Sequence, residues 1–244
     1  MAREVALFES RNGIEPVDHD IQKARDGFDL LGYETQYFLR SDMDRVVNRM
    51  DKPVVVGTID GMKQYFNAQK CMPKPMDYPA SLRPWVRRNL RIWNLKNAIA
   101  EFKSNGVPMF LKPVDTKVFD GIPVSHEDHL HYFKGLGNPR VWISPIVDIV
   151  SEWRCYVHKG EMVHASNYSG DCTVSPDWKY VKEMVGCHHQ PPDAYTLDVA
   201  VLKDGSNDLI EANDFWAIGS YSLDPVKYAE MLRDRFMYIT FYVK

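Results

Sequence analysis

The sequence lacks the features that would place it in a membrane, secreted or generally nucleic-acid-binding class. No apolar run reaches the roughly 18 residues that a membrane-spanning helix needs, and the opening MAREVALFES contains no apolar signal-peptide segment. A formal charge of −3 gives no electrostatic reason for general affinity to nucleic acid or membrane surfaces. We therefore expect a soluble, cytoplasmic protein without a membrane partner.

Cysteine is scarce, with four residues in 244. They lie far apart and form no C-x-x-C pair, which argues against a disulfide framework or a structural zinc site. Cys187-His188-His189 is the one stretch that suggests a metal, but adjacent ligands point in different directions, so we expect a solvated loop there. The G-x-x-x-x-G-K-[ST] pattern of a Walker loop is absent too. The cysteines are Cys71, Cys155, Cys172 and Cys187.

The chain does have the hydrophobic content, 45%, to bury a large core, which excludes a disordered protein. Its first 75 residues alternate between strand-like and helix-like patterns. This alternation predicts a small α/β domain, residues 1–75, with a mostly parallel sheet. The predicted strands are residues 4–10, 33–39 and 53–59, and the predicted helices are residues 18–32, 42–50 and 61–69.

A proline-rich stretch, CMPKPMDYPASLRPW, then favours extended or turn backbone and marks a predicted domain boundary. Past it, strands that return through short turns indicate an α+β domain with antiparallel sheets, residues 76–244. The predicted helices are residues 83–106, 125–137, 175–186 and 224–242. The predicted strands are residues 107–113, 140–150, 152–168 (two strands around a KG turn), 196–202 and 208–214.

Acidic and amide residues interrupt the last hairpin, TLDVAVLKDGSNDLIEAND. Alternation puts Glu211 and Asn213 on one face of their strand and Ile210 and Ala212 on the other. Pairing through the KDGSN turn can bring Asp198 opposite Glu211 and Asn213. Three hard oxygen ligands close together suit Mg²⁺ held jointly with phosphates. The same residues would equally line the wet face of an exposed hairpin.

Two cationic segments precede this hairpin. In MFLKPVDTKVFDG, a strand presents Lys112 on the face opposite Leu111, and a loop with Lys117 and Gly121 follows; such lysines suit a polyphosphate or are simply solvated. In SEWRCYV, Glu152, Arg154 and Tyr156 share a face, while Cys155 faces the core. Arg154 would stand near a transferring phosphoryl group or form a plain salt bridge.

Three further stretches leave alternatives open. The strand VWISPIVDIV breaks at Pro145, which frees backbone groups to read an adenine edge or marks an ordinary edge kink. In FWAIGSYSL, Ser220 and Tyr221 are candidate donors to a substrate, or residues of a plain turn. SLRPWVRRNLRIWNLK could hold an acidic peptide or a nucleic-acid end, although a solvated basic face with packed tryptophans is favoured. Its basic and aromatic residues are Arg83, Arg87, Arg88, Arg91, Trp85 and Trp93.

The order of these segments resembles the ATP-grasp superfamily of carboxylate-amine ligases. It runs from a lysine strand through a short glycine loop, an interrupted strand and an E-x-R strand to an Asp that is followed about a dozen residues later by E-x-N. FLKPVDTKVFDG, EWR and IEANDFWAIGSYSL look most like a clade of small ATP-grasp proteins of bacteria and phages. The resemblance covers about residues 76–244, and the α/β segment before it is similar to the domain that precedes the ATP-grasp fold in such enzymes.

The resemblance implies the following binding roles. Lys112 and Lys117 would bind the phosphates of ATP, with Lys117 in a mobile loop. The hinge would hold the adenine, and the nearby acidic residues would contact the ribose or the rest of the nucleotide: Ser144, Ile146, Val147, Asp148 and Glu152. Arg154, with Lys117 and Glu152, would act in catalysis on the transferred phosphate or acyl phosphate. Magnesium would be coordinated by Asp198, Glu211 and Asn213.

Two departures from the family pattern bear on function. The glycine loop is shorter than in the large ligases, and Ser144-Pro145 stands where many members have a glutamine or glutamate. The implied activity is ATP- and Mg²⁺-dependent joining of a carboxylate and an amine through an acyl phosphate. The alternatives are an ATP-grasp phosphotransferase and a nucleotide-binding interaction protein without turnover. The acid and the amine are not specified by the sequence, and a peptide or protein end is one candidate.

Overall fold

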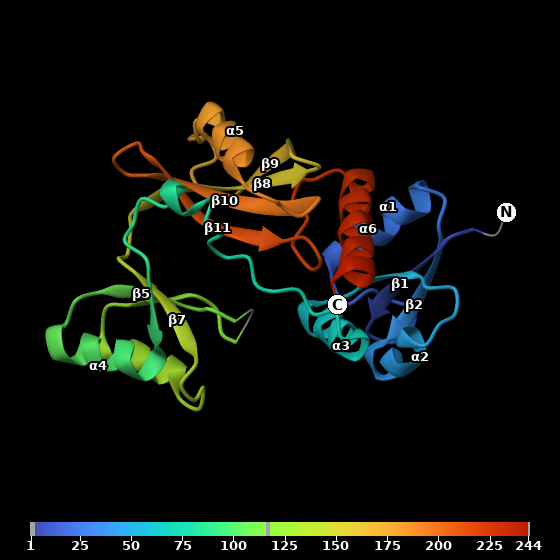
Figure 1. Cartoon of the computed structure of the whole chain (residues 1–244), viewed down its shortest axis with the longest axis horizontal. Coiled ribbons are helices and arrows are strands. Elements are labelled where there is room, and N and C mark those ends of the chain that lie inside the picture. Colours follow the sequence, from blue (N-terminus) through green and yellow to red (C-terminus); the bar gives the residue numbers. More distant parts are fainter. Residues whose placement is uncertain (1–2, 116–117, 244) are drawn as a thin grey trace.

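The computed structural model describes residues 3–115 and 118–243, which are built around three β-sheets (Figure 1). The first sheet is parallel, with strand order β2-β1-β3. Its central strands are apolar and buried, as a sheet with helices on its faces requires. The parallel sheet expected in this segment is therefore confirmed. The elements are β1 (Val5–Ser10), α1 (His19–Leu30), β2 (Glu34–Leu39), α2 (Met43–Val47), β3 (Val54–Val56) and α3 (Ile59–Gln69).

Side-chain caps set where the two longer helices of this layer begin. The Asp18 carboxylate accepts a hydrogen bond from the backbone N–H of Ile21 at the start of α1. The Thr58 hydroxyl accepts one from the N–H of Gly61 at the start of α3. Each cap satisfies an N–H that has no partner inside its helix. Both helix starts thereby lie at the carboxyl ends of the parallel strands.

The second sheet is antiparallel, with order β4-β7-β5-β6. Helix α4 covers one face of it (Figure 1), where Leu95, Ala98 and Phe102 pack with Leu111 and Val141 in a buried cluster. The amphipathic spacing of α4 thus closes the core of this sheet. The elements are β4 (Arg91–Asn94), α4 (Leu95–Asn105), β5 (Met109–Pro113), β6 (Ile122–Val124) and β7 (Arg140–Ser144).

Two helix predictions in this part of the chain are wrong. The helix expected from residue 83 starts at Leu95, because residues 91–94 pair with β7 as strand β4, and Arg83–Trp85 form a 3₁₀ turn. The partner strand is distant in sequence and leaves no mark on local periodicity. Residues 125–137 contain a 3₁₀ helix, Glu127–Phe133, instead of an α-helix. The predicted end of α4 is confirmed, since Gly106 is its left-handed C-cap with φ +66°.

The third sheet is antiparallel, with order β11-β10-β8-β9. The KG turn joins β8 to β9 with positive φ at both Lys159 and Gly160, the conformation of a tight hairpin turn. Helix α5 covers one face (Figure 1), where Cys155, Val157 and Leu197 are buried. The opposite face is left for polar residues. The elements are β8 (Ile149–His158), β9 (Glu161–Gly170), α5 (Trp178–Cys187), β10 (Ala194–Leu202) and β11 (Asn207–Asp214).

The last helix, α6 (Pro225–Tyr242), joins the end of the chain to its beginning. In Figure 1 it stands beside α1 and the first sheet, and its residues Phe236 and Ile239 share one buried cluster with Phe8 and Phe28. Tyr156 of the third sheet belongs to the same cluster. The core around the parallel sheet therefore draws on both ends of the chain, and a separate domain ending at residue 75 stays a prediction.

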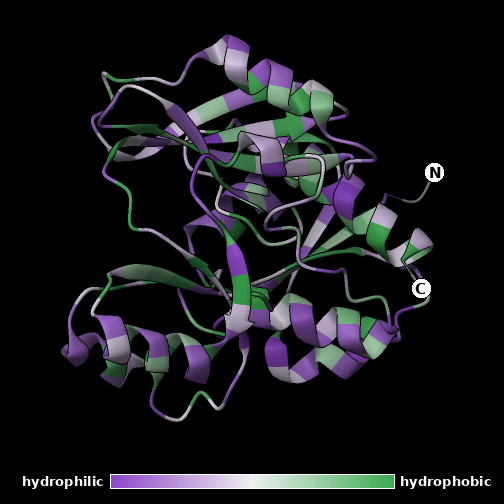
Figure 2. Ribbon diagram, turned by 60° about the vertical axis from the view of Figure 1, so that its left-hand side comes forward, coloured by the Kyte–Doolittle hydropathy of each residue, from purple (hydrophilic) through white to green (hydrophobic). Residues whose placement is uncertain are grey.

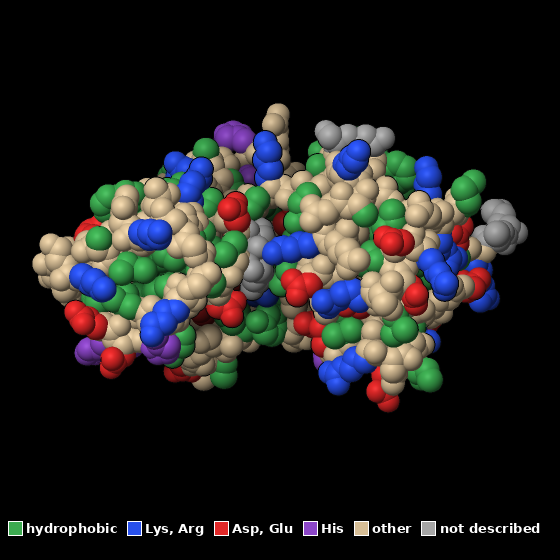
Figure 3. All heavy atoms as spheres, turned by 90° about the horizontal axis from the view of Figure 1, so that it is seen from below, with side chains coloured by type: hydrophobic (Ala, Val, Ile, Leu, Met, Phe, Trp, Pro, Cys, Tyr) green, Lys and Arg blue, Asp and Glu red, His purple; other side chains and the backbone are tan. Residues whose placement is uncertain are grey.

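The surface has a mixed character. Hydrophilic and hydrophobic residues alternate along the helices in Figure 2. No helix within residues 3–115 and 118–243 is both long and apolar enough to span a bilayer. Acidic and basic side chains are interspersed on the face shown in Figure 3. That face therefore presents no field of a single sign.

Candidate functional site

Lys112 links the second sheet to the third. Along β5 the residues Met109, Leu111 and Pro113 are buried, and Lys112 faces away from them, as the alternation predicts. The Lys112 ammonium contacts the Glu211 carboxylate of β11, and it lies 2.6 Å from Oδ1 of Asp77. A cation from one sheet is thus held by two carboxylates outside that sheet.

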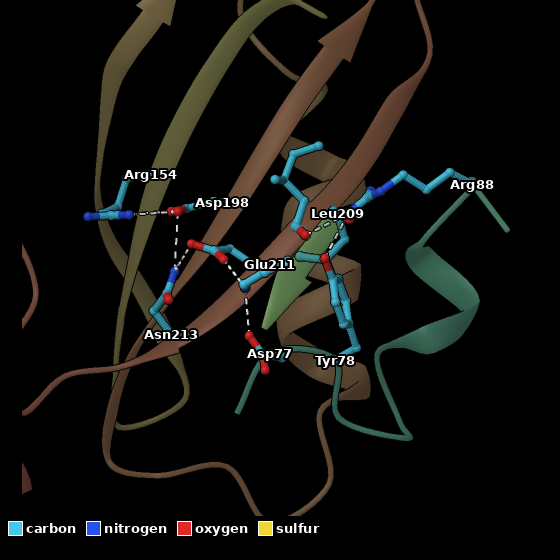
Figure 4. A network of polar contacts seen from close by, with 10 residues as sticks. Asp77, Tyr78, Arg88, Arg154, Asp198, Leu209, Glu211 and Asn213 are labelled. Carbon is cyan, nitrogen blue, oxygen red and sulfur yellow. Dashed lines mark hydrogen bonds and ion pairs between the residues drawn. The ribbon is translucent and has the colours of Figure 1, made fainter. Parts of the chain in front are cut away.

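The polar residues of the third sheet form a row across three strands (Figure 4). Arg154 of β8 is the register partner of Asp198 on β10, and Asp198 is the partner of Glu211 on β11. Two hydrogen bonds join the Arg154 guanidinium to Asp198, at 2.8 and 2.6 Å. The Asn213 amide donates to Asp198 (3.2 Å) and to Glu211 (2.8 Å). The predicted convergence of Asp198, Glu211 and Asn213 is confirmed.

A β-bulge changes the neighbouring residue. The register shifts between Asp198 and Val199, so Ile210 has no partner on β10. The prediction that Ile210 faces the core together with Ala212 is therefore wrong, because Ile210 lines the cavity described below. The side chain of Arg88 satisfies the backbone at the bulge: it donates to the carbonyls of Leu209 (2.8 Å) and Ile210 (2.7 Å).

Arg88 also corrects the expectation of a solvated basic face. Its side chain is 6% exposed and forms an ion pair of 2.8 Å with Asp208, whose side chain is fully buried. Its guanidinium also lies 5.7 Å from the ring centroid of Tyr78. The expected packing of the tryptophans fails as well for Trp93, which is 40% exposed and lies under Arg91. The stretch is not a continuous helix, so its residues do not divide into helical faces.

The carboxylates of this network differ in their affinity for protons. Burial opposes ionisation of Glu211, but the adjacent Lys112 outweighs it and lowers the pKa of Glu211 to about 2. Complete burial raises the pKa of Asp198 to about 7, although Arg154 counters part of the effect. Burial also raises the pKa of Asp77 and of Glu152. Negative charge is therefore in excess here within the described part of the chain.

The network forms one wall of a cavity of about 660 Å³. Its polar side includes Lys112, Glu152 and Arg154, while its other side is largely apolar and comes from the second sheet and the hinge that follows β7. The hinge is the predicted break at Pro145: β7 ends at Ser144 and β8 begins at Ile149. The apolar side consists of Phe110, Phe119, Pro123, Pro145, Ile146, Val147 and Ile149.

The structure places the remaining predicted nucleotide residues as follows. Ser144, Ile146 and Val147 line the cavity. Asp148 is not among its lining residues; its carbonyl accepts a hydrogen bond of 2.9 Å from the N–H of Lys203, which ties it to the end of β10, so its side chain does not reach a ribose in this cavity. Lys117 lies outside the described residues.

A family model described as an ATP-grasp domain, family 2 of its clade, matches residues 85–231, which contain Lys112, Arg154 and the acidic hairpin. This chain belongs to that ATP-grasp family. The resemblance seen in the sequence is thus confirmed, and so is the ATP-grasp fold with antiparallel sheets.

Solved structures show the same fold at low sequence identity. The crystal structure of D-cycloserine synthetase DcsG is 14% identical with a TM-score of 0.62, covering 95% of this chain and 99% of that one. D-Alanine–D-alanine ligase from Bacillus anthracis, complexed with ATP, is 12% identical with a TM-score of 0.61 and 98% coverage of both chains. No curated protein matches this chain.

Two tyrosines complete the surroundings of Arg154 in this ATP-grasp site. The guanidinium carbon lies 5.4 Å from the ring centroid of Tyr168 and 5.2 Å from that of Tyr221. The two rings stack on one another, with centroids 5.5 Å apart. Tyr168 was not predicted; it lies on β9, whose alternation gives no sign that one tyrosine faces an arginine. Cation–π contacts and Asp198 together hold Arg154 in one orientation.

Ser220 and Tyr221 differ in what they offer. Ser220 is fully buried, and both its N–H (2.9 Å) and its hydroxyl (2.5 Å) donate to Asp20 of α1. It therefore fastens the loop after β11 to α1, and its hydroxyl proton is not free for a substrate as the sequence suggested. Tyr221 is 45% exposed, lines the cavity and has φ +40°, a rare conformation for a bulky residue.

Asp77 is the site residue that the sequence hid most completely. It lies in the proline-rich stretch that was interpreted as a boundary. Its carbonyl accepts a hydrogen bond of 2.8 Å from the N–H of Ala212, so the stretch runs beside β11, and its carboxylate holds Lys112. An Asp between prolines carries no sign of such a contact, because the partners are contributed by strands more than thirty positions away.

The donor set fits a magnesium ion. Asp198, Glu211 and the amide oxygen of Asn213 are hard ligands that converge on one cavity. The excess of carboxylates, expressed in the raised pKa of Asp198 and Asp77, would be offset by a divalent cation. No cluster of three or more His, Cys, Asp or Glu side chains with metal-binding geometry occurs among residues 3–115 and 118–243. That includes the stretch at His188, whose ring instead contacts Ser81.

Proposed function

We propose that this protein is an ATP-dependent carboxylate-amine ligase that works through an acyl phosphate and releases ADP and phosphate. The observation that carries the proposal is the convergence of Lys112, Arg154 and the Asp198–Glu211–Asn213 set on one cavity between two antiparallel sheets. Cations, hard oxygen ligands and an apolar slot in one place are what phosphoryl transfer from ATP requires.

In this proposal the nucleotide spans the cavity from its apolar side to its polar side. The adenine would lie along the hinge residues Ser144, Ile146 and Val147, where the broken strand leaves backbone groups free. The phosphates would lie at Lys112, with Lys117 as a second cation. Glu152 would stand beside the nucleotide, and the donor set would hold magnesium, which neutralises phosphate charge when bound.

Nucleotide binding would exchange ion-pair partners at Lys112. In this structure its ammonium is taken up by Glu211 and Asp77. A polyphosphate that draws the ammonium away leaves the Glu211 carboxylate without its cation. That carboxylate stays ionised, because its pKa is about 2, and it is then available as a metal ligand. Binding of the nucleotide and of the metal should therefore depend on each other.

Arg154 would serve the transferred group. Asp198 and the two tyrosines fix its guanidinium, so little reorganisation is needed as charge develops. A substrate carboxylate oxygen attacks the γ-phosphorus, and the bond to ADP breaks with its electron pair. An amine nitrogen then attacks the acyl carbon, and phosphate leaves with the electron pair of the C–O bond. Removing one such stabilising contact typically costs about 3 kcal/mol.

The test is a calorimetric titration with Mg-ATP. We expect binding that requires magnesium and that weakens at least tenfold in Lys112→Ala, which loses a charged contact worth about 2 kcal/mol. The double variant Glu211→Ala/Asn213→Ala should lose the magnesium dependence. Lys103→Ala, an exposed lysine at the end of α4, is the matched control.

A screen of acids and amines for ADP release then separates the reactions. Amide formation supports the ligase, whereas a stable phosphorylated product without amide indicates a phosphotransferase. Absence of Mg-ATP binding by the unmodified protein at millimolar nucleotide would overturn the proposal.

A further inference from the structure

A second cavity, of about 470 Å³, lies at the carboxyl edge of the parallel sheet. The strand order β2-β1-β3 places β2 and β3 on opposite sides of β1, so the connections leave β1 in different directions. Open α/β sheets bind ligands in the crevice at such a switch point. The starts of α1 and α3 and the loop at residues 216–219 form its walls. We call this cavity the crevice.

Arg40 is held rigidly at the crevice by a buried carboxylate. Its Nε donates to Oε1 of Glu9 (2.7 Å), and its Nη2 donates to the Thr58 hydroxyl (2.8 Å). Thr58 in turn donates its N–H and its hydroxyl to Oε2 of Glu9, both at 2.8 Å. Glu9 is 1% exposed. A carboxylate buried this far is costly unless it is paired, and here its cationic partner is Arg40.

The backbone is shaped around this pair. A Cβ added to Gly57 would lie 2.7 Å from Oε2 of Glu9, and one added to Gly61 would lie 2.2 Å from it. Two glycines therefore make room for the carboxylate that orients Arg40. The Arg40 side chain remains 44% exposed and lines the crevice, and its Nη1 is 3.9 Å from the exposed Asp60. A preoriented guanidinium of this kind matches a carboxylate.

The other end of the crevice meets the ATP-grasp cavity. Both cavities are lined by Ile59 and by residues 216–219. A Cβ placed on Gly219 would lie 3.4 Å from Oδ2 of Asp20 and 3.7 Å from Nη1 of Arg154. Oδ1 of Asp20 is occupied by Ser220, whereas Oδ2 is directed to this meeting point. A carboxylate oxygen of the crevice thus stands close to the proposed phosphoryl-transfer arginine.

We infer that the crevice binds the amine substrate, and that this substrate is a small amino acid. Its carboxylate would pair with Arg40, and its ammonium would pair with Asp20 at the meeting point beside Arg154. The cavity volume suits a ligand of this size. The inference rests on the proposed ligase function, because an amine delivered there reaches the acyl phosphate held at Arg154.

The test compares ligands on the unmodified protein. Thermal unfolding is followed with Mg²⁺ and a non-hydrolysable ATP analogue, and proteinogenic amino acids and their D-enantiomers are added singly at millimolar concentration. At least one free amino acid should raise the unfolding temperature, and its carboxamide and its N-acetyl derivative should not. Each derivative removes one of the two charges that the crevice recognises.

A variant series locates the contact. Arg40→Lys keeps a cation beside Glu9 but loses the fork, so we expect the amino acid to bind about tenfold or more weakly, with Mg-ATP affinity unchanged. Arg45→Lys is the matched control, because the Arg45 side chain is 88% exposed on the following helix. The preference for the free acid over its carboxamide should also shrink in Arg40→Lys and persist in Arg45→Lys.

The failures are distinguishable. If Mg-ATP binds but no free amino acid does, or if the carboxamide binds as tightly as the acid, the amino-acid inference is wrong and the ligase proposal stands. If Mg-ATP itself fails to bind, both are wrong.

Discussion

Arg154 and Asp198 face each other across neighbouring strands and are joined by two hydrogen bonds, of 2.8 and 2.6 Å. Both side chains are almost completely buried, at 10% and 1% exposure. A buried pair of this kind contributes little net stability against an apolar pair of equal size. Its value lies in orientation: the guanidinium is held in one place at the edge of the cavity. Catalytic and structural consequences can therefore be tested separately.

Replacing Arg154 with lysine should impair turnover more than binding. Lysine keeps the positive charge but cannot form two parallel hydrogen bonds to Asp198, so the charge is no longer held in place. We expect kcat for ADP release to fall about a hundredfold, with Mg-ATP affinity changed by much less. Steady-state kinetics and calorimetry measure the two effects. Arg140→Lys, at the exposed start of β7, is the control; equal losses in kcat and affinity would contradict the assigned role.

Two adjacent arginines should differ sharply in their effect on stability. Arg88→Ala leaves the fully buried Asp208 without its ion-pair partner and strips two carbonyls at the β-bulge of their donor. We expect a loss of about 3–5 kcal/mol in the free energy of unfolding. Arg87 is exposed, so Arg87→Ala should change stability by less than about 0.5 kcal/mol. Urea unfolding measures both, and equal effects would refute the solvent exclusion inferred for Arg88.

Two helical glycines should respond to alanine with opposite signs. In α5, nothing lies within 4 Å of a Cβ added to Gly186, so Gly186→Ala should stabilise the protein by about 0.5–1 kcal/mol. In α3, the same substitution at Gly61 drives the Cβ into the Glu9 carboxylate. Gly61→Ala should destabilise by about 1–3 kcal/mol despite its better helix propensity. Thermal unfolding of the two variants decides the point; a stabilising Gly61→Ala would show that Glu9 is free to move.

An ion cluster far from the ATP site should govern part of the acid sensitivity. Burial opposes ionisation of Asp234, but Lys159, Arg233 and His158 outweigh it and lower its pKa from 3.8 to about 2. Between these values the unfolded chain binds the proton more tightly, so the stabilisation is present above pH 3.8 and is lost as the pH falls to about 2.

We therefore expect the free energy of unfolding to fall by about 1 kcal/mol more in the unmodified protein than in Asp234→Asn over this acid range. Urea titrations at a series of pH values measure the difference. Glu161→Gln, an exposed residue at the start of β9, serves as the control and should keep the acid dependence of the unmodified protein. A parallel pH profile in Asp234→Asn would contradict the prediction.

Gly219 offers a steric test of the meeting point between the two cavities. A Cβ there makes only ordinary contacts, 3.4–3.7 Å from Asp20, Tyr221 and Arg154. Gly219→Ala should therefore fold normally and bind Mg-ATP normally. It should raise KM for the amine substrate about tenfold, because the methyl group occupies space beside Arg154. Kinetics with the amine identified above measure this, and an unchanged KM would place the amine elsewhere.

Much of the site was readable from the sequence because strands alternate strictly. A period of two put Glu211 and Asn213 on one face and set Lys112 apart from Leu111, and a turn of five residues brought Asp198 opposite them. The break at Pro145 followed from the missing N–H of proline. These features depend on covalent structure and near neighbours, which local sequence records.

Other parts of the site depend on contacts between distant segments. Asp77 and Arg88 lie in a stretch without regular periodicity, and their partners are on β5 and β11. Strand β4 forms in place of a helix because β7 offers it a backbone partner. The bulge that turns Ile210 into the cavity changes the register by one residue, which no alternation pattern can encode.

By itself, the sequence determined the order of most elements, the acidic and cationic residues that share a face, and the family to which the chain belongs. The tertiary structure alone decided which cation meets which carboxylate, that α6 returns to the first sheet, and that Arg40 and Asp20 line a crevice next to Arg154. The physical reason is the range of the forces. Side-chain periodicity acts over a few residues, whereas burial and charge pairing are set by residues that only folding brings together.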